Sequence, residues 1–131
     1  MPSFGTKSEG QLTTCHTKLI FVARRAIVVR DFSVIEGFRN KTLQNHYFDE
    51  GTSKLRWPDG EHNDTPSRAY DLWPYPWPTK EDWENREYWI EWSSWMRGFA
   101  AGLGVVLISG MDWDNDYDLD DQKFHDGPHF Q

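Results

Sequence analysis

Cysteine, long apolar runs and clustered basic residues are all scarce in this chain of 131 residues. The single cysteine, Cys15, excludes an internal disulfide and a cysteine-based metal cage. It falls on the apolar stripe of a predicted helix, so we expect a buried, inert thiol. Apolar runs such as Val105–Ile108 are far too short to span a membrane. Residues 1–17 lack the basic start and apolar run of a signal peptide. We therefore expect synthesis in a cytoplasm and no membrane anchor.

Positive charge is also in short supply, with 14 Lys and Arg against 21 Asp and Glu and a formal net charge of -7. No basic cluster is longer than Arg24-Arg25, so nucleic acid is not an expected partner. Charge alone would not hold the chain on anionic membranes either. Tryptophan, in contrast, is abundant, with eight residues. We interpret these tryptophans as core and groove-lining residues, and ligand stacking is the alternative.

The N-terminal half of the sequence alternates between helical and strand patterns. Ser8 and Gln11 fit a capping box, and apolar residues at helical spacing predict an amphipathic helix over residues 9–29. Alternation predicts a short strand over residues 32–36. A second helix is expected over residues 41–49, before a loop rich in Ser, Gly, Pro, Asp and Asn.

The pattern of the C-terminal half predicts three short strands and a long helix. A strand over residues 68–72 would place Asp71 on one face. Thr79 should cap a helix that ends at Gly102. We expect a buried strand at residues 105–108 and a last strand at residues 128–131. The fold class is therefore α+β, with helices packed on a small, mostly antiparallel sheet.

Four residues from separate segments suggest a catalytic metal site. Catalytic zinc takes three protein ligands from His and Asp or Glu and keeps a fourth position for water. His62, Asp71 and His129 would supply such a set. Asp126, three residues before His129 across a Gly-Pro turn, would supply a base for that water. Each residue alone also has an ordinary role, since a lone His is often a surface or core residue and HDG is a common turn.

Several stretches resemble successive motifs of zinc-dependent peptidoglycan peptidases. In chain order they are GFR at 37–39, Gln44, GTSK at 51–54, HNDTPSRAYDLWPYP at 62–76, GMDW at 110–113 and DGPHFQ at 126–131. The resemblance is to the VanY-like group of D-Ala-D-Ala carboxypeptidases and phage L-alanyl-D-glutamate endolysins, and it covers residues 3–131. It implies a hedgehog/D-Ala-D-Ala peptidase-like fold with a zinc site on the sheet.

The resemblance implies a role for each matching residue. The zinc ligands would be His62, Asp71 and His129. Asp126 would be the general base. Arg39 would hold substrate and steady charge on the scissile carbonyl oxygen, although an arginine at a strand end is otherwise a surface charge. Gln44 and Ser53 match positions near the substrate groove.

The sequence departs from the family pattern at two places. Gly60 stands where the family has a serine two residues before its first histidine ligand. The hydrogen bond of that hydroxyl would then come from Ser53 or Ser67. The family often ends in HFEL, whereas this chain stops at Phe130-Gln131, so a final hydrogen-bonding or packing contact is expected to change.

The expected function is that of a phage endolysin: a Zn²⁺ peptidase that hydrolyses the L-alanyl-D-glutamate bond of the peptidoglycan stem peptide. A D-Ala-D-Ala carboxypeptidase is the first alternative. A catalytically inactive, zinc-containing peptidoglycan-binding domain is the second, and the presence of Asp126 favours an enzyme. We expect one catalytic domain over residues 1–131, without a wall-binding module, and a monomer. It would stay in the host cytoplasm until a holin-type pore releases it to the cell wall or periplasmic peptidoglycan.

An aspartate-rich segment at residues 112–122 is a separate candidate for cation binding. It lacks the EF-hand glycine at loop position six, where Tyr117 stands, and the final glutamate, where Lys123 stands. A solvated acidic loop is the expected reading, with a calcium site as the alternative. Three spare histidines match no ligand position: His16, His46 and His125.

Overall fold

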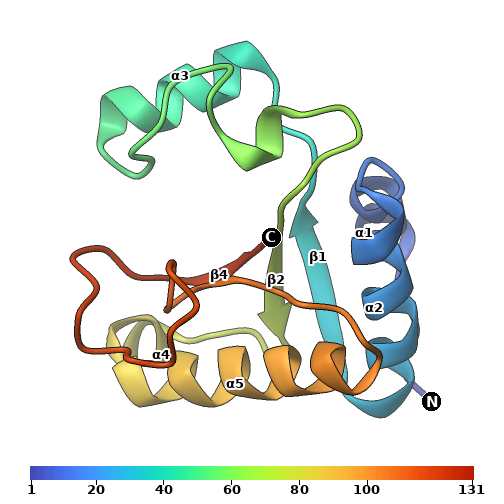
Figure 1. The fold of residues 1–131 in the computed structure, drawn as a ribbon. Coiled ribbons are helices and arrows are strands. Elements are labelled where there is room, and N and C mark those ends of the chain that lie inside the picture. Colours follow the sequence, from blue (N-terminus) through green and yellow to red (C-terminus); the bar gives the residue numbers. More distant parts are fainter.

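A four-stranded antiparallel sheet with the order β1-β2-β4-β3 forms the centre of the computed structural model, which describes residues 1–131 (Figure 1). The strands are β1 (Phe32–Glu36), β2 (Tyr70–Pro74), β3 (Ser109–Gly110) and β4 (Asp126–Phe130). The predicted α+β class, with helices packed on a small antiparallel sheet, is confirmed. The last expected strand is also confirmed, although it starts at Asp126.

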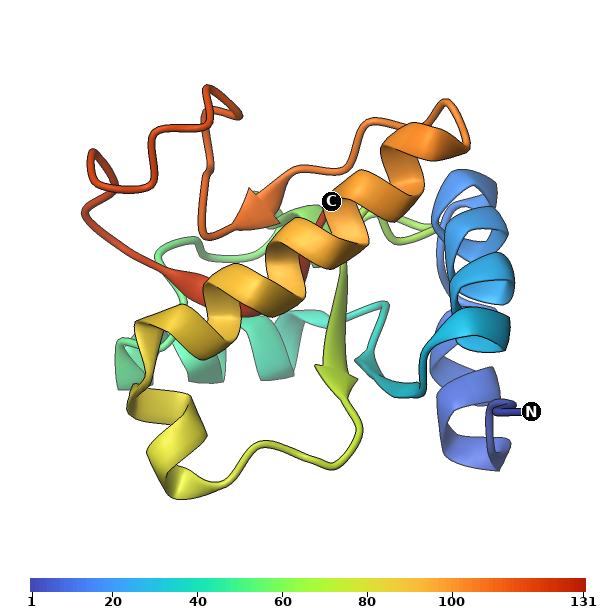
Figure 2. The same ribbon diagram turned by 90° about the horizontal axis from the view of Figure 1, so that it is seen from below.

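One face of the sheet is buried under helices. Phe32 and Val34 of β1 alternate with half-buried residues, as do Tyr70 and Leu72 of β2. These four side chains pack with the apolar faces of α2 (Thr17–Val29) and α5 (Arg86–Gly102) in the core. Figure 2 shows α5 running across the molecule beside the sheet, with α2 at one side. Because side chains alternate along a strand, the other face of β1 and β2 remains for a pocket.

The core also uses its tryptophans, as predicted. Trp92 is fully buried, and its indole N–H donates to the carbonyl of Leu72 at 3.1 Å. Trp89, on the same helix, is 5% exposed. A buried indole needs a hydrogen-bond partner, so this bond makes Trp92 suitable for the interior. Not every tryptophan is buried, however, because Trp77 and Trp83 are 56% and 42% exposed.

The predicted single helix over residues 9–29 is wrong, because the structure has two helices there. They are α1 (Thr6–Leu12) and α2 (Thr17–Val29). Between them, the His16 N–H donates to the carbonyl of Ser67 at 2.8 Å. This long-range bond replaces an intrahelical one, so the helix is interrupted where it meets the strand that carries the site.

The predicted capping box at Ser8 and Gln11 is wrong for the same reason. The Ser8 hydroxyl accepts a hydrogen bond from the Val34 N–H at 3.0 Å, and the Gln11 side chain accepts one from the Gly37 N–H at 3.0 Å. Both polar side chains therefore satisfy the backbone of β1 and of the residue that follows it. Sequence spacing alone does not distinguish this use from a helix cap.

Helix α3 (Lys41–Glu50) agrees with its prediction and ends at Gly51, whose φ is 81°. The loop that follows contains one short 3-10 helix, Glu61–Asn63. Strand β2 begins two residues later than expected. The Arg68 N–H donates to the carbonyl of Glu61 at 3.0 Å, so it is not available to the sheet.

Two further differences lie in the C-terminal half. Thr79 caps a helix as predicted, but only the short α4 (Lys80–Glu84), and Asn85 then caps α5 by accepting from the Glu87 N–H at 3.1 Å. The expected strand at residues 105–108 is absent, and Val106 is 66% exposed. The two-residue β3 follows directly, at Ser109–Gly110. None of the helices is long and apolar enough to cross a bilayer.

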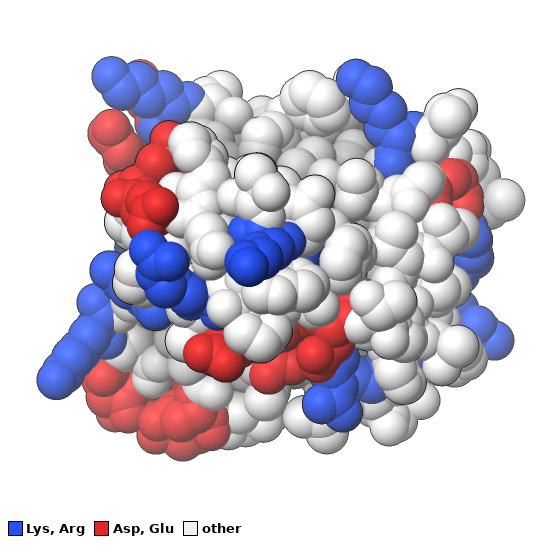
Figure 3. Space-filling model, turned by 90° about the horizontal axis from the view of Figure 1, so that it is seen from above, with Lys and Arg blue, Asp and Glu red and all other residues white.

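Basic and acidic side chains are interspersed on the surface seen in Figure 3. Lys and Arg stand there singly or in small groups, between acidic and uncharged residues. This face therefore has no continuous basic surface of the kind that holds a phosphate backbone.

Candidate metal centre

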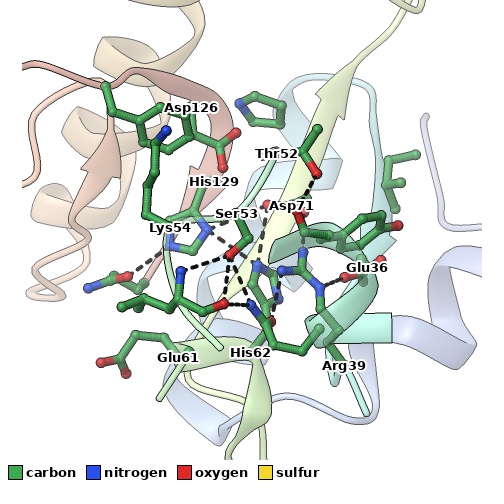
Figure 4. Close-up of a pocket in the computed structure, with 18 of the residues that line it drawn as sticks. Glu36, Arg39, Thr52, Ser53, Lys54, Glu61, His62, Asp71, Asp126 and His129 are labelled. Atoms are coloured by element: carbon green, nitrogen blue, oxygen red, sulfur yellow. Dashed lines mark hydrogen bonds and ion pairs between the residues drawn. The ribbon is translucent and has the colours of Figure 1, made fainter. Parts of the chain in front are cut away.

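The sheet brings together the three residues that the sequence suggested as ligands. Asp71 on β2 lies opposite His129 on β4 in the antiparallel pairing of these strands. His62 lies in the 3-10 helix. The Arg39 N–H donates to the His62 carbonyl at 2.8 Å, and this bond ties the 3-10 helix to the segment just after β1. One potential ligand atom from each of the three side chains lies within 4.8 Å of the other two (Figure 4).

The outer nitrogen of each imidazole is held by a neighbour. His62 Nδ1 lies 2.7 Å from the carbonyl oxygen of Gly37. His129 Nε2 lies 2.8 Å from the side-chain oxygen of Gln131. Since both oxygens are acceptors, the neutral tautomer of each imidazole that fits these contacts carries its hydrogen on the outer nitrogen. His62 Nε2 and His129 Nδ1 are then left with lone pairs.

These two lone pairs point to the same place as one oxygen of Asp71. His62 Nε2 and His129 Nδ1 are 3.2 Å apart, and Asp71 Oδ1 is 3.4 Å from the first and 3.6 Å from the second. Asp71 Oδ1 is buried and has no hydrogen-bond partner. Burial opposes its charge, yet the two imidazoles hold the pKa of Asp71 far below its usual value. An anionic, unpaired oxygen beside two lone pairs is costly unless a cation is shared.

The chemistry of this donor set fits a zinc ion. Two imidazole nitrogens and one carboxylate oxygen form a common catalytic zinc set, and hydrogen-bonded outer nitrogens are typical of zinc-binding histidines. Burial works against a charged imidazole, but the nearby carboxylate of Asp71 raises the pKa of His129. When no metal is bound, His129 therefore binds a proton more readily than an ordinary histidine.

Arg39 holds the other oxygen of Asp71. Its Nη2 lies 3.5 Å from Asp71 Oδ2, its Nε forms an ion pair with Glu36, and its Nη1 donates to the Gln44 side chain at 3.1 Å. The guanidinium also lies over the ring of Tyr47, 4.7 Å from the ring centre. With 11% of its side chain exposed, Arg39 is a fixed group at the metal site rather than a free surface charge.

Gln44 and Ser53 both line the same pocket, and they support Arg39. Gln44 is 1% exposed, and its amide N–H groups donate to the Ser53 hydroxyl at 2.9 Å and to the Leu55 carbonyl at 2.6 Å. The Gln44 oxygen accepts from Arg39 and from Asn63. All donors of this amide are used within the protein, so Gln44 positions the arginine.

Because Gly60 has no side chain, the Asn63 side chain can lie directly against its backbone. A Cβ atom on Gly60 would lie 2.8 Å from the Asn63 side-chain oxygen and 3.2 Å from that of Gln44. Instead, the Gly60 N–H donates to that Asn63 oxygen at 2.9 Å. Ser53 and Ser67 were the two residues expected to supply the hydrogen bond of the family serine. Ser53 lies in the pocket, whereas the Ser67 hydroxyl donates to the carbonyl of Ala69.

Asp126 lines this pocket from the start of β4. The pairing of β3 with β4 is irregular there, with Ser109 opposite Phe130 but Gly110 opposite Asp126. Asp126 forms no ion pair with a basic side chain and is not one of the three clustered residues. Burial, together with the charge of Asp71, raises the pKa of Asp126 to about 6. A carboxylate with this pKa can exchange a proton at neutral pH.

The pocket that contains these groups has a volume of about 810 Å³. Aromatic side chains form much of its wall, and they are Trp73, Trp83, Trp113 and Phe124. Lys54 also lines it, with its Nζ 5.1 Å from the centre of the Phe124 ring, and forms no ion pair. Lys54 is therefore a cation in the pocket wall without a carboxylate partner.

Sequence reasoning missed the residues that orient Arg39 and the two histidines. Glu36 binds Arg39, the Gly37 carbonyl fixes His62, and Gln131 fixes His129. Glu36 had a signal, since it lies three residues before the arginine. Gln131 was considered only as an altered chain end, whereas it supplies a contact to a histidine two residues before it.

The other candidate groups lie apart from this pocket. Asp112, Asp114 and Asp116 have carboxylate oxygens within 4.8 Å of one another, but Asp112 is fully buried and already pairs with Arg97 at 3.1 Å. Asp114 and Asp116 are exposed, as a solvated loop requires. The spare histidines bond elsewhere: His16 caps α2, His46 faces Glu50 and His125 faces the Leu119 carbonyl.

The fold and the site together define an α+β domain with a His-Asp-His group that could hold a metal ion, beside a second, protonatable carboxylate. A family model described as phage L-alanyl-D-glutamate peptidase matches residues 2–131. The L-alanyl-D-glutamate peptidase of Escherichia phage T5 is 32% identical over 134 residues, covering 98% of this chain and 96% of the phage protein. The chain belongs to the phage L-alanyl-D-glutamate peptidase family.

A solved structure supports the fold assignment. The L-Ala D-Glu endopeptidase ChiX of Serratia marcescens superposes with a TM-score of 0.71 at 24% sequence identity. The match covers 99% of this chain and 90% of that one. The resemblance of motifs that the sequence suggested is therefore confirmed at the level of the family and the fold.

Proposed function

We propose that this chain is a zinc-dependent endolysin peptidase that hydrolyses the L-alanyl-D-glutamate bond of peptidoglycan stem peptides. One observation carries the metal part of this proposal: Asp71 Oδ1 is buried without a hydrogen-bond partner and faces two imidazole lone pairs. Membership of the phage L-alanyl-D-glutamate peptidase family supports the choice of bond.

His62, Asp71 and His129 would hold the zinc ion, which when bound would supply polarisation of the scissile carbonyl and a lower pKa for water. Asp126 would accept a proton from the water that attacks the alanyl carbonyl carbon. It then gives the proton to the departing amine of D-glutamate as the carbon–nitrogen bond breaks. The pKa of about 6 suits both transfers, because the group is mostly ionised at neutral pH yet still basic.

Arg39 has two tasks in this scheme. It holds the outer oxygen of Asp71, 3.5 Å away. Its positive charge would also stabilise the oxygen of the carbonyl under attack. An existing charge aimed at a developing oxyanion contributes several kcal/mol in a site of this kind, roughly 3 for a single donor. Gln44 and Ser53 keep the guanidinium in place. Lys54 would bind a carboxylate of the acidic stem peptide.

The proposal extends to the whole chain and its setting. Residues 1–131 act as one catalytic domain and as a monomer. The enzyme remains in the host cytoplasm until a holin-type pore gives it access to peptidoglycan. The relative from Escherichia phage T5, matched over 96% of its own length, supports this domain organisation.

Mass spectrometry of purified peptidoglycan after digestion, with and without a chelator, tests the proposed activity. New D-glutamate amino termini that appear only without the chelator are expected. Free D-alanine without such termini would show a carboxypeptidase instead. A metal-loaded protein that releases no product at all would be a binding domain.

A further inference from the structure

Three tryptophans, Trp73, Trp77 and Trp83, form a continuous aromatic surface that begins in the pocket and leaves it; we call this surface the tryptophan ledge. The Trp73 ring centre lies 5.7 Å from that of Trp77 and 5.4 Å from that of Trp83, and both pairs are close to perpendicular. Trp73 and Trp83 line the pocket. The ledge is therefore continuous with the proposed active site.

Strand β2 fixes where the ledge starts. Asp71 and Trp73 are two residues apart on this strand, so their side chains lie on the same face of the sheet. Two residues of strand span about 6.6 Å. The first ring of the ledge is thus about one dipeptide length away from a proposed zinc ligand.

The rings of the ledge are held in place but remain uncovered. The Trp77 indole N–H donates to the Ser33 hydroxyl at 3.2 Å, although 56% of the residue is exposed. Trp83 is 42% exposed and packs on the nearly buried Trp89, with ring centres 4.8 Å apart. No Lys or Arg side chain stacks on the three ledge rings. Fixed, open aromatic faces beside a pocket are characteristic of a binding surface rather than of packing alone.

The chemistry of the proposed substrate indicates what would cover these faces. In peptidoglycan, the L-alanine of the stem is joined through a lactyl group to the sugar N-acetylmuramic acid. One amino-acid residue and the lactyl group separate the scissile bond from the sugar ring, a reach of about 7 Å at 3.3–3.6 Å per residue unit. This reach matches the distance along β2 from Asp71 to Trp73.

We propose that the tryptophan ledge binds the sugar ring of N-acetylmuramic acid on the N-terminal side of the scissile bond. A pyranose has a face of C–H groups that packs flat on an indole, and it needs no charged partner there. This inference rests on the proposed function, because the sugar is placed by the bond that is cut. It makes the enzyme selective for stem peptides that are still attached to the glycan strand.

The test compares two substrates that differ only in the sugar. One is a free stem peptide that begins with L-alanyl-D-glutamate, and the other is the same peptide carrying N-acetylmuramic acid on its N-terminus. The wild type should cleave the sugar-bearing peptide with the higher kcat/KM. Trp77→Ala should lower kcat/KM on that substrate by about tenfold, mostly through KM, with a much smaller effect on the free peptide.

Two further variants separate binding from folding. Trp77→Phe keeps a flat ring and should recover most of the loss seen with Trp77→Ala. Phe21→Ala is the matched control, because Phe21 is an exposed aromatic residue, 38% exposed, on α2 and outside the pocket. It should leave kcat/KM on both substrates unchanged. Thermal melting of each variant shows whether the fold is retained.

The outcomes distinguish this inference from the function on which it rests. Equal kcat/KM on both substrates, or an equal loss on both in Trp77→Ala, would overturn the proposed sugar site but not the proposed peptidase activity. A wild type that cleaves neither peptide would remove the proposed function itself. Sedimentation with phosphatidylcholine vesicles that depends on Trp77 would also overturn the inference, since the ledge would then be a membrane-surface contact.

Discussion

Changing Asp126 to Asn separates catalysis from metal binding at this site. Asp126 is not among the three clustered residues and forms no ion pair with a basic side chain. The amide fills nearly the same volume, and it removes the repulsion with Asp71 that helps to raise the pKa of Asp126 to about 6. The variant should therefore keep its fold and its zinc.

The expected loss is in rate. An amide can hydrogen-bond to the attacking water but cannot accept its proton. Removal of a general base typically costs about 10²–10⁴-fold, which corresponds to about 2.7–5.4 kcal/mol of activation free energy. The assay measures kcat/KM on a stem peptide, zinc content by elemental analysis and the melting temperature of the same preparation. Asp71→Asn is the matched control, since loss of a ligating carboxylate should weaken the metal, and added zinc should restore part of the activity.

Two results would refute this reasoning. If Asp126→Asn loses its zinc while Asp71→Asn keeps it, Asp126 is a ligand and the roles are exchanged. If Asp126→Asn keeps both zinc and full activity, the base must be another acid. The acids that line the same pocket, Glu50 and Glu61, would then be tested first.

Three further predictions concern pH, metal affinity and packing. Catalysis needs ionised Asp126, whose pKa is about 6 and would be lowered by a nearby divalent cation. The value of kcat/KM should therefore rise with pH to a plateau, with an apparent pKa of 6 or below. The same rise with pH in Asp126→Asn would contradict the assignment. Gln131→Ala should weaken zinc binding by about 10–100-fold in a chelator competition, because Gln131 orients His129, and an unchanged affinity would argue against that role. Gly127→Ala should lower the free energy of unfolding by about 1–3 kcal/mol in urea, because a Cβ there would collide with the Trp89 indole. Gly98→Ala, with open space around it, should not destabilise.

Local sequence signals determined much of the scaffold. Strand β1 lies where the alternation of residues 32–36 predicted it, and α3 ends at Gly51 in a left-handed conformation. The α+β class and the family also follow from motifs that are readable along the chain. These features were predictable because each depends on neighbours a few residues away, or on a motif whose spacing is kept.

Predictions failed where a distant segment competes for a backbone group. The helix over residues 9–29 breaks because the His16 N–H bonds to Ser67, and Ser8 serves the backbone of Val34 rather than a helix cap. At residues 105–108 the chain forms no strand, and Val106 is exposed while Leu107 is buried. Composition and periodicity carry no information about which remote partner a donor will meet.

The same distinction holds for the site. The residue types of His62, Asp71 and His129, with a family resemblance, were enough to suggest a ligand set from sequence. Only the tertiary structure decided that Gly37 and Gln131 leave their inner lone pairs free, and that Asp71 has an oxygen with no partner. The reason is physical: the chemical type of a ligand is fixed by its side chain. Lone-pair direction, pKa and an exposed aromatic face depend on distances between atoms that only folding brings together.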